Sequence, residues 1–231
     1  MLNLHQEIIL LFCKKLSDNE KVAFAATSKQ LEWIKHYVRY CTQMWTHDIA
    51  HLPYFDQFTN VKVSQSKYNL PKSITHLTFS SKFKGSLTGH IPESVTHLTF
   101  NNQFDKPLKN VIPTSVTHLT FGKYFNQPIR DTIPVSVTHL TFGNYFDQPV
   151  RCFIPTSVTH LTFGDEFNQS VKDALPPFVT HLIFGGDFNQ PVDGCIPGTV
   201  THLKFGRSFN QSIRKCLPDS VQHLEFSRFS N

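Results

Sequence analysis

The chain has 231 residues, of which 39% are hydrophobic and 17% are charged, a composition that excludes disorder over its full length. Its net charge of +5 is distributed without a basic block or stripe, which argues against a protein dedicated to nucleic-acid binding. No apolar run approaches the ~18 residues of a membrane-spanning helix. No secretory signal is predicted, because Lys14 and Lys15 interrupt the first apolar run.

The cysteines indicate a reducing compartment. Their number is odd and none forms a C-x-x-C motif, so they are expected to be free thiols. Together with the missing secretory signal, this predicts a cytoplasmic location. The cysteines are Cys13, Cys41, Cys152, Cys195 and Cys216.

Apolar residues at helical spacing predict a module of three helices in residues 1–48. The first helix is expected over residues 4–15. The second begins at the capping box Ser17-Asp18-Asn19-Glu20 and runs to about Thr27. The third is predicted from Lys29 to Trp45. So short a module buries too little surface to be stable alone, so it must pack against the rest of the chain or a partner.

The spacing of these apolar residues resembles the F-box, a helical module that binds the Skp-type adaptor of a cullin ubiquitin ligase. The residues that carry the resemblance are the apolar Leu4, Ile8 and Leu16, together with Glu7, the Ser17-Asp18 turn and Ser28. The alternative is a plain helical cap over the first unit of the repeat that follows. If the resemblance holds, the adaptor would contact Leu4, Ile8, Leu11 and Leu16.

Residues 49–69 match neither the helical spacing before them nor the repeat after them, and are interpreted as a connector and N-terminal cover. A 21-residue period begins after them. Eight units without an insertion fill residues 70–231, which predicts a solenoid. A proline recurs in each unit, from Pro71 to Pro218. One residue of each unit is an invariant histidine: His76, His97, His118, His139, His160, His181, His202 and His223.

Each unit contains one short strand. Leu119 and Phe121 alternate with His118 and Thr120, which is the period of a half-buried strand. The recurring prolines exclude a continuous ladder elsewhere in the unit. The predicted fold class is therefore α+β, a three-helix module followed by a leucine-rich-repeat-like solenoid with one parallel sheet.

The unit resembles the FNIP repeat, a variant of the leucine-rich repeat found in social amoebae and in the giant DNA viruses that infect amoebae. The pattern that carries the resemblance is Val-Thr-His-Leu-Thr-Phe-Gly, then Phe-Asn-Gln-Pro-Ile, then Ile-Pro. It implies strands on the concave side of an arc and, for a viral protein, a location in the host cytoplasm. The sequence departs from the pattern at Ser170, Phe178, Ser212 and Phe229.

The histidine ladder, defined as the eight invariant histidines, is interpreted as structural rather than as a metal array or a pH sensor. Neighbouring imidazolium ions would repel one another, so the ladder is expected to be neutral at pH 7 and to loosen toward pH 5. The recurring asparagine and aspartate after the second phenylalanine, as at Asn126, are expected to stabilise turns. The recurring phenylalanines are expected to stack in the core.

Variable positions after each strand are candidates for partner binding, because aromatic and charged residues on a rigid support suit protein recognition. An ordinary solvated rim is the alternative. The threonine row of the strands breaks at Ile183, Lys204 and Glu225, either to protect the sheet edge or to form a recognition surface. The predicted rim residues are Lys123, Tyr124, Asn144, Tyr145, Asp165, Glu166, Asp187 and Arg207.

No sequence motif for phosphate, dinucleotide or metal-dependent catalysis is present, so no enzymatic activity, cofactor or metal is expected. The combined resemblances favour a substrate receptor of a cullin-type ubiquitin ligase, in which the helices bind the adaptor and the repeats bind a target protein. The alternative is a repeat binding or assembly protein whose N-terminal helices only cap the solenoid.

Overall fold

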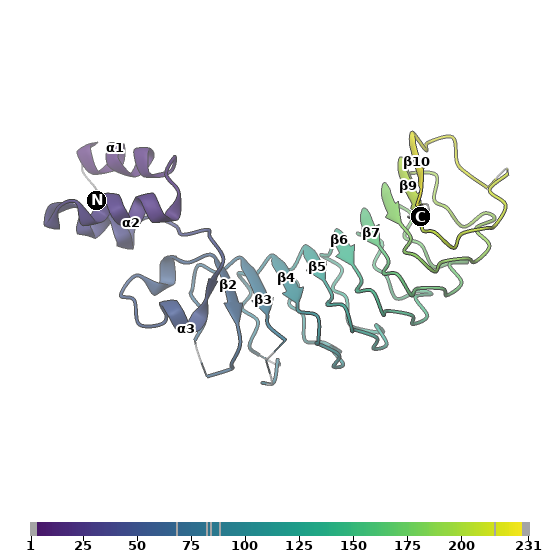
Figure 1. The fold of residues 1–231 in the computed structure, drawn as a ribbon, viewed down its shortest axis with the longest axis horizontal. Helices are drawn as coiled ribbons and strands as arrows, with labels where there is room; N and C mark the ends of the chain where they lie inside the picture. The colour runs from purple at the N-terminus through teal and green to yellow at the C-terminus, as the bar shows by residue number, and fades with distance from the viewer. Residues whose placement is uncertain are drawn as a thin grey trace.

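The computed structural model describes residues 4–67, 69–81, 83, 85–87, 89–214 and 216–227. The chain forms an arc with helices at its N-terminal end and a sheet along its inner side (Figure 1). Within the described residues, the sheet has ten parallel strands that follow one another in chain order, from β1 to β10. The predicted solenoid with one parallel sheet is confirmed. Phe229, at which the repeat pattern changes, lies outside the described residues.

The N-terminal helices are α1 (Leu4–Cys13) and α2 (Asp18–Ala26). The predicted capping box begins α2: the Ser17 hydroxyl accepts a hydrogen bond from the Glu20 N–H, and the Glu20 carboxylate accepts one from the Ser17 N–H at 2.8 Å. These reciprocal bonds satisfy two backbone groups that have no partner inside the helix, which fixes its first turn.

The prediction of a third helix to Trp45 is wrong. Only a 3₁₀ helix, η1 (Lys29–His36), forms in this segment. Tyr40 leaves the helical path because its N–H donates to the carbonyl of Gln57 at 3.0 Å and its carbonyl accepts from the N–H of Thr59 at 2.9 Å. These long-range hydrogen bonds replace the bonds that a continued helix would make, so a three-helix F-box module is not established.

The sheet begins before the recognisable repeats. β1 (Met44–Trp45) and β2 (Asn60–Val63) precede the repeat strands, with the short helices α3 (Thr46–Ile49) and η2 (Phe55–Gln57) between them. The sequence predicts a connector and N-terminal cover over residues 49–69, whereas β2, which lies within this range, is a full member of the sheet. The reason is local alternation: Val61 and Val63 are buried, and Asn60 pairs with His76 in the position of a ladder histidine.

One strand follows in each repeat unit, and equivalent residues pair in register, so histidine lies opposite histidine and leucine opposite leucine. The strands are β3 (His76–Phe79), β4 (His97–Phe100), β5 (His118–Thr120), β6 (His139–Thr141), β7 (His160–Thr162), β8 (His181–Ile183), β9 (His202–Phe205) and β10 (His223–Phe226).

The core is a continuous column of leucine and phenylalanine beneath the sheet. In a central unit the rings of Phe142 and Phe146 stack with their centroids 4.0 Å apart. Phe142 also stacks on Phe163 of the next unit at 5.6 Å, and Phe146 on Phe167 at 6.2 Å. Each unit therefore buries its apolar side chains against both neighbours, which explains why one unit could not be stable alone.

A glycine ends the strand segment in most units because the neighbouring units approach very closely there. A Cβ atom built on Gly143 would overlap with the carbonyl oxygen of Gly122, and the same holds for Gly164 against Gly143. Any side chain at these positions would force the units apart.

Candidate interaction surfaces

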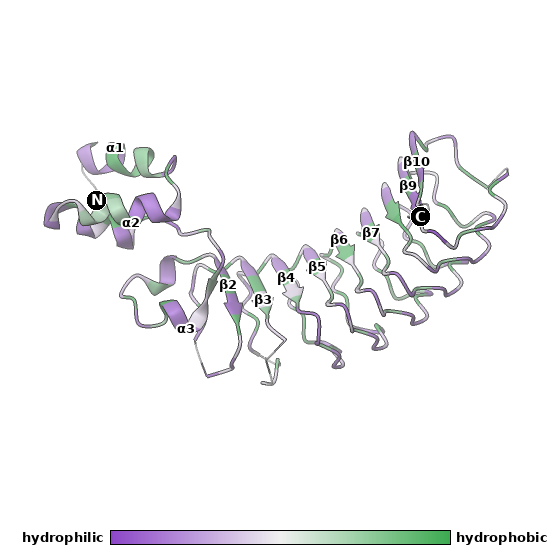
Figure 2. Cartoon of the chain, in the orientation of Figure 1, coloured by the Kyte–Doolittle hydropathy of each residue, from purple (hydrophilic) through white to green (hydrophobic). Residues whose placement is uncertain are grey.

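The apolar face of α1 is exposed. The side chains of Leu4, Ile8 and Leu11 form one row at helical spacing, and each residue is between 56% and 70% exposed. Phe12 beside them is also exposed and makes an edge contact with Phe24 of α2. Figure 2 shows the hydrophobic part of α1 at the end of the molecule farthest from the repeats. Leu16, the fourth predicted docking residue, is half-buried and packs against the core instead.

A shallow hollow of about 390 Å³ lies between α1 and the segment that follows η1. Its lining includes Leu10 and Leu11 of α1 together with Tyr37 and Val38. The hollow continues the exposed apolar face, so α1 and its surroundings present more apolar surface than a single helix.

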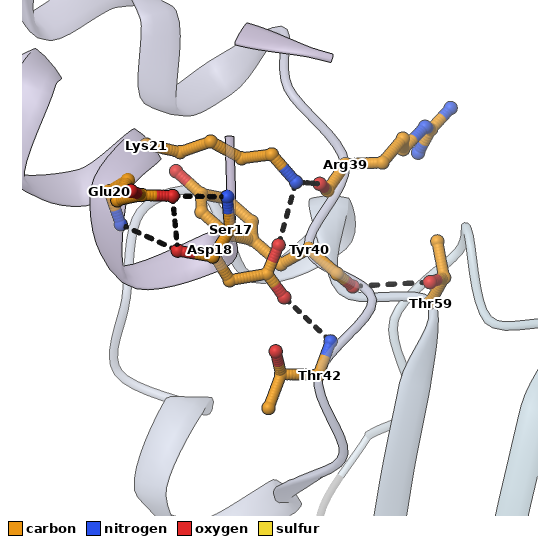
Figure 3. Close-up of polar contacts among 8 residues, drawn as sticks. All are labelled: Ser17, Asp18, Glu20, Lys21, Arg39, Tyr40, Thr42 and Thr59. Atoms are coloured by element: carbon orange, nitrogen blue, oxygen red, sulfur yellow. Dashed lines mark hydrogen bonds and ion pairs between the residues drawn. The ribbon is translucent and has the colours of Figure 1, made fainter. Parts of the chain in front are cut away.

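A buried polar cluster connects α2 to the start of the sheet (Figure 3). The ammonium of Lys21 donates to the Asp18 carboxylate at 2.7 Å and to the carbonyl of Arg39 at 2.9 Å. The same carboxylate accepts the N–H of Thr42 at 2.6 Å. Although burial acts to raise the pKa of Asp18, the hydrogen bonds from Lys21 and Thr42 outweigh it and lower that pKa below its ordinary value.

The inner face of the arc carries the histidine ladder. Adjacent imidazole rings are stacked with centroids 4.1 Å apart, for example between His97, His118 and His139. The Nδ1 atom of His118 lies 2.9 Å from the hydroxyl of Thr117, and that hydroxyl donates to the carbonyl of Thr96 in the preceding unit at 3.3 Å. Each histidine from His97 to His202 therefore contacts its own threonine and the rings of its two neighbours, whereas His223 at the end of the ladder follows Gln222 instead of a threonine.

The environment of the ladder favours neutral imidazoles. Burial in the first place, and then the neighbouring His97 and His139, lower the pKa of His118 to about 4. Burial in the first place, and then other histidines of the ladder, also lower the pKa values of His97, His139 and His160. Among the described residues, no group of three metal-ligating side chains is placed to hold a metal ion.

The predicted rim follows the strands and is rigid, because a second set of backbone hydrogen bonds crosses from unit to unit there. The N–H of Tyr145 donates to the carbonyl of Lys123 at 2.9 Å, and the N–H of Glu166 donates to that of Asn144 at 2.8 Å. The rim side chains therefore keep a fixed spacing along the arc.

The rim divides into an aromatic and a charged part. Tyr124 and Tyr145 stack at 4.9 Å, and the ammonium of Lys123 lies 5.6 and 5.7 Å from the two ring centroids. Further along, the Asn144 amide donates to Asp165 at 2.7 Å. In the charged part, Arg207 pairs with Asp187 at 3.2 Å, and a hollow of about 470 Å³ includes Ile183, Lys204 and Arg207.

The recurring asparagine and aspartate after the second phenylalanine form hydrogen bonds between successive units rather than within one turn. The side-chain oxygen of Asn126 accepts the N–H of Asp147 at 3.0 Å and the amide of Gln148 at 2.9 Å, both in the next unit. Asp147 accepts the equivalent bonds from Asn168 and Gln169. These side chains join successive units on the side away from the sheet.

A row of cations on the outer side of the arc was not predicted from the sequence. These residues are far apart in the chain, so no basic stripe is evident there, whereas the folded units align them. Comparing the same position in successive units would have found them. The row, named here the outer basic row, consists of Lys109, Arg130, Arg151 and Lys172.

All five cysteines lie within the described residues, and each is a free thiol. Within the same part of the chain, no helix combines the length and apolarity needed to cross a bilayer.

Comparison with known proteins gives one family match and several relatives. The model of the FNIP repeat matches residues 85–124, 125–166, 150–187, 167–206 and 188–229. Two proteins of Acanthamoeba polyphaga mimivirus are similar. "Putative F-box protein L168" is 29% identical over 37% of this chain and 42% of its own length, and "Putative F-box protein L166" is 32% identical over 36% and 34%. The chain thus spans well under half the length of these relatives.

A solved structure shares the fold of the repeats. The crystal structure of CroV588, described as a novel circular LRR protein, has a TM-score of 0.58 and 35% sequence identity with this chain. The similarity covers 76% of this chain and 34% of the CroV588 chain.

Proposed function

The chain belongs to the FNIP-repeat family and is a protein-interaction scaffold, and on this premise we propose that it is the substrate receptor of a cullin-type ubiquitin ligase. In this role the N-terminal helices bind a Skp-type adaptor in the cytoplasm, and the repeats bind the protein to be ubiquitinated. No chemistry by the chain itself is required, since a receptor acts by holding its target near the ligase.

The exposed face of α1 supports the proposal most directly. Leu4, Ile8 and Leu11 remain in solvent although the solenoid buries its own apolar column. An amphipathic helix that leaves such a row exposed is typical of helix docking, in which the i, i+4 and i+7 side chains enter a groove of the partner. The names of the mimivirus relatives agree with an F-box role.

The target-binding part of the proposal concerns the rim. Inter-unit hydrogen bonds hold the backbone of Tyr124 and Tyr145, and their rings stack on each other, so the two side chains lose less conformational entropy when a partner binds. The charged part around Asp187 and Arg207 would add specificity rather than affinity, because its ion pairs are exposed.

The experiment is a pull-down of purified Skp-type adaptor and cullin with the full chain. The variant Ile8→Asp/Leu11→Asp places two charges on the docking face and should abolish adaptor binding. Val135→Asp is the matched control, because Val135 is an apolar residue of the repeats that is 78% exposed. Adaptor binding that survives the α1 variant, or its absence in the unmodified chain, would refute the proposal.

The rival role, a cap over the solenoid, is supported by the buried cluster of Asp18, Lys21 and Thr42. A cap predicts that changes on the exposed face of α1 leave both folding and binding of partners unaltered. The same two variants therefore distinguish the two roles.

A further inference from the structure

The outer basic row has a regularity that neither the fold nor the adaptor proposal requires. Along the chain, each member lies about midway between the strands of two successive units, and in the fold it lies on the side of the arc away from the sheet. Two ion pairs show that the units meet there: Lys109 lies 3.5 Å from Asp131 of the next unit, and Arg151 lies 3.4 Å from Asp173 of the next unit.

The cations of the row are available to a partner. The side chains of Lys109, Arg130 and Arg151 are between 68% and 77% exposed, and Lys172 is also exposed. Four cations face two carboxylates, since Asp131 lies near both Lys109 and Arg130. Exposed ion pairs of this kind contribute about 0–1 kcal/mol, so a partner's carboxylate can replace them at small cost.

A hollow of about 390 Å³ interrupts the row between Arg151 and Lys172. It lies where the unit carries Ser170 in place of the proline found at Pro149 and Pro191. The Ser170 hydroxyl accepts a long hydrogen bond of 3.4 Å from the Lys172 N–H and can still donate. The lining of the hollow combines this hydroxyl with Arg151 and Lys172 and also with the carboxylate of Asp173, which pairs with Arg151 at 3.4 Å. A partner's carboxylate must therefore displace Asp173 from Arg151 to bind at this point of the row.

We propose that the outer basic row is a docking surface for an acidic polypeptide segment, whose carboxylates pair with its four exposed cations. Successive units are about 4.8 Å apart at the sheet and farther apart on the outer side of the arc. This spacing approaches the ~5–6 Å between neighbouring acidic side chains on one face of a helix. The surface is separate from the docking face of α1 and from the rim.

The row fits a polypeptide better than a nucleic acid. Its members are interleaved with Asp131 and Asp173, which repel a continuous phosphate backbone. Single-strand binding also uses aromatic side chains on which bases stack, and the row contains only lysine and arginine. Separate carboxylates on a peptide can instead pair with single cations and avoid the two aspartates.

The test measures binding of a fluorescein-labelled oligoglutamate peptide to the full chain by anisotropy at low and high salt. Arg130→Glu/Arg151→Glu should weaken binding by at least about tenfold, because like charges then face the peptide. Lys29→Glu/Lys72→Glu makes the same change of charge on other exposed surfaces, away from the row, the rim and the docking face of α1, and should reduce binding less than about twofold. Higher salt should weaken binding to the unmodified chain.

Three results would overturn the inference. One is an equal loss of binding in both double variants, which indicates only a response to net charge. Another is no measurable binding of the peptide at low salt. The last is tighter binding of an oligothymidylate of equal charge, lost in Arg130→Glu/Arg151→Glu, which assigns the row to nucleic acid. Circular dichroism of each variant confirms that the exposed substitutions leave the fold intact.

Discussion

The carboxylate of Asp18 accepts the backbone N–H of Thr42 at 2.6 Å and so joins the first turn of α2 to the segment that leads into the sheet (Figure 3). Lys21 completes the connection through the carbonyl of Arg39. The side chains of Lys21 and Asp18 are only 10% and 13% exposed. The helices are therefore attached to the solenoid through a nearly buried ion pair.

Asp18→Ala should loosen this attachment. The substitution leaves the ammonium of Lys21 nearly buried without its counter-ion, which we expect to cost about 2–3 kcal/mol. Hydrogen exchange should show faster opening of α2, while the central repeats keep their protection. Glu32→Ala is the control, because the Glu32 side chain is 64% exposed and its pair with Lys35 should contribute less than about 0.5 kcal/mol. Equal rates of hydrogen exchange in α2 for the two variants would contradict the prediction that the pair of Lys21 with Asp18 stabilises the attachment of the helix.

The histidine ladder should make the protein sensitive to acid. The pKa of His118 is about 4 in the folded chain and about 6.5 when unfolded, so below pH 6.5 the unfolded state binds more protons. Stability is thus fully present above pH 6.5 and falls as the pH decreases toward 4. Urea unfolding at pH 7.5, 6.5 and 5.5 measures this, above the range in which ordinary carboxylates titrate.

The same measurement on His118→Gln provides the control for this pH dependence. The variant has one titrating group fewer in the ladder and should lose part of the decrease between pH 6.5 and 5.5. A urea midpoint that does not move over this range in the unmodified chain would show that the ladder does not couple protonation to unfolding.

Gly143→Ala should disrupt the stacking of units, since the added Cβ overlaps with the carbonyl oxygen of Gly122. We expect a loss of about 2 kcal/mol or more in the free energy of unfolding, as for an overpacked core. Gly198→Ala is the matched control, because no atom lies within 4 Å of its added Cβ. Thermal unfolding should show a lower midpoint for Gly143→Ala alone, and equal midpoints for the two variants would contradict the prediction.

Asn126→Ala should weaken the junction between two units. It removes the acceptor for the N–H of Asp147 and for the amide of Gln148, two hydrogen bonds worth about 1 kcal/mol each. Asn126→Asp retains the acceptor oxygen and reproduces the arrangement at Asp105 and Asp147, so it should be nearly neutral. The free energy of unfolding of both variants, measured with a chemical denaturant, tests whether the junction depends on the side-chain oxygen alone or on the whole amide group.

Much of the candidate site could be predicted because it belongs to the repeat. The position of His118 or Tyr124 relative to its neighbours follows once units stack in register, since equivalent residues must then lie one above the other. The exposed row of Leu4, Ile8 and Leu11 could also be predicted from helical spacing. Leu16 fits the same spacing and yet packs inward, because spacing alone does not reveal which neighbours cover a side chain.

The sequence by itself determined the parallel sheet, its register and the phenylalanine core, because a strict 21-residue period leaves each apolar side chain only its own counterpart to pack against. Only the tertiary structure decided where the sheet begins and where η1 ends. Both depend on contacts such as Tyr40 with Thr59, between residues that share no repeat. The cations of the outer basic row recur at one position of the repeat, but only the stacked units bring them side by side on one surface, because each lies 21 residues from the next in the chain.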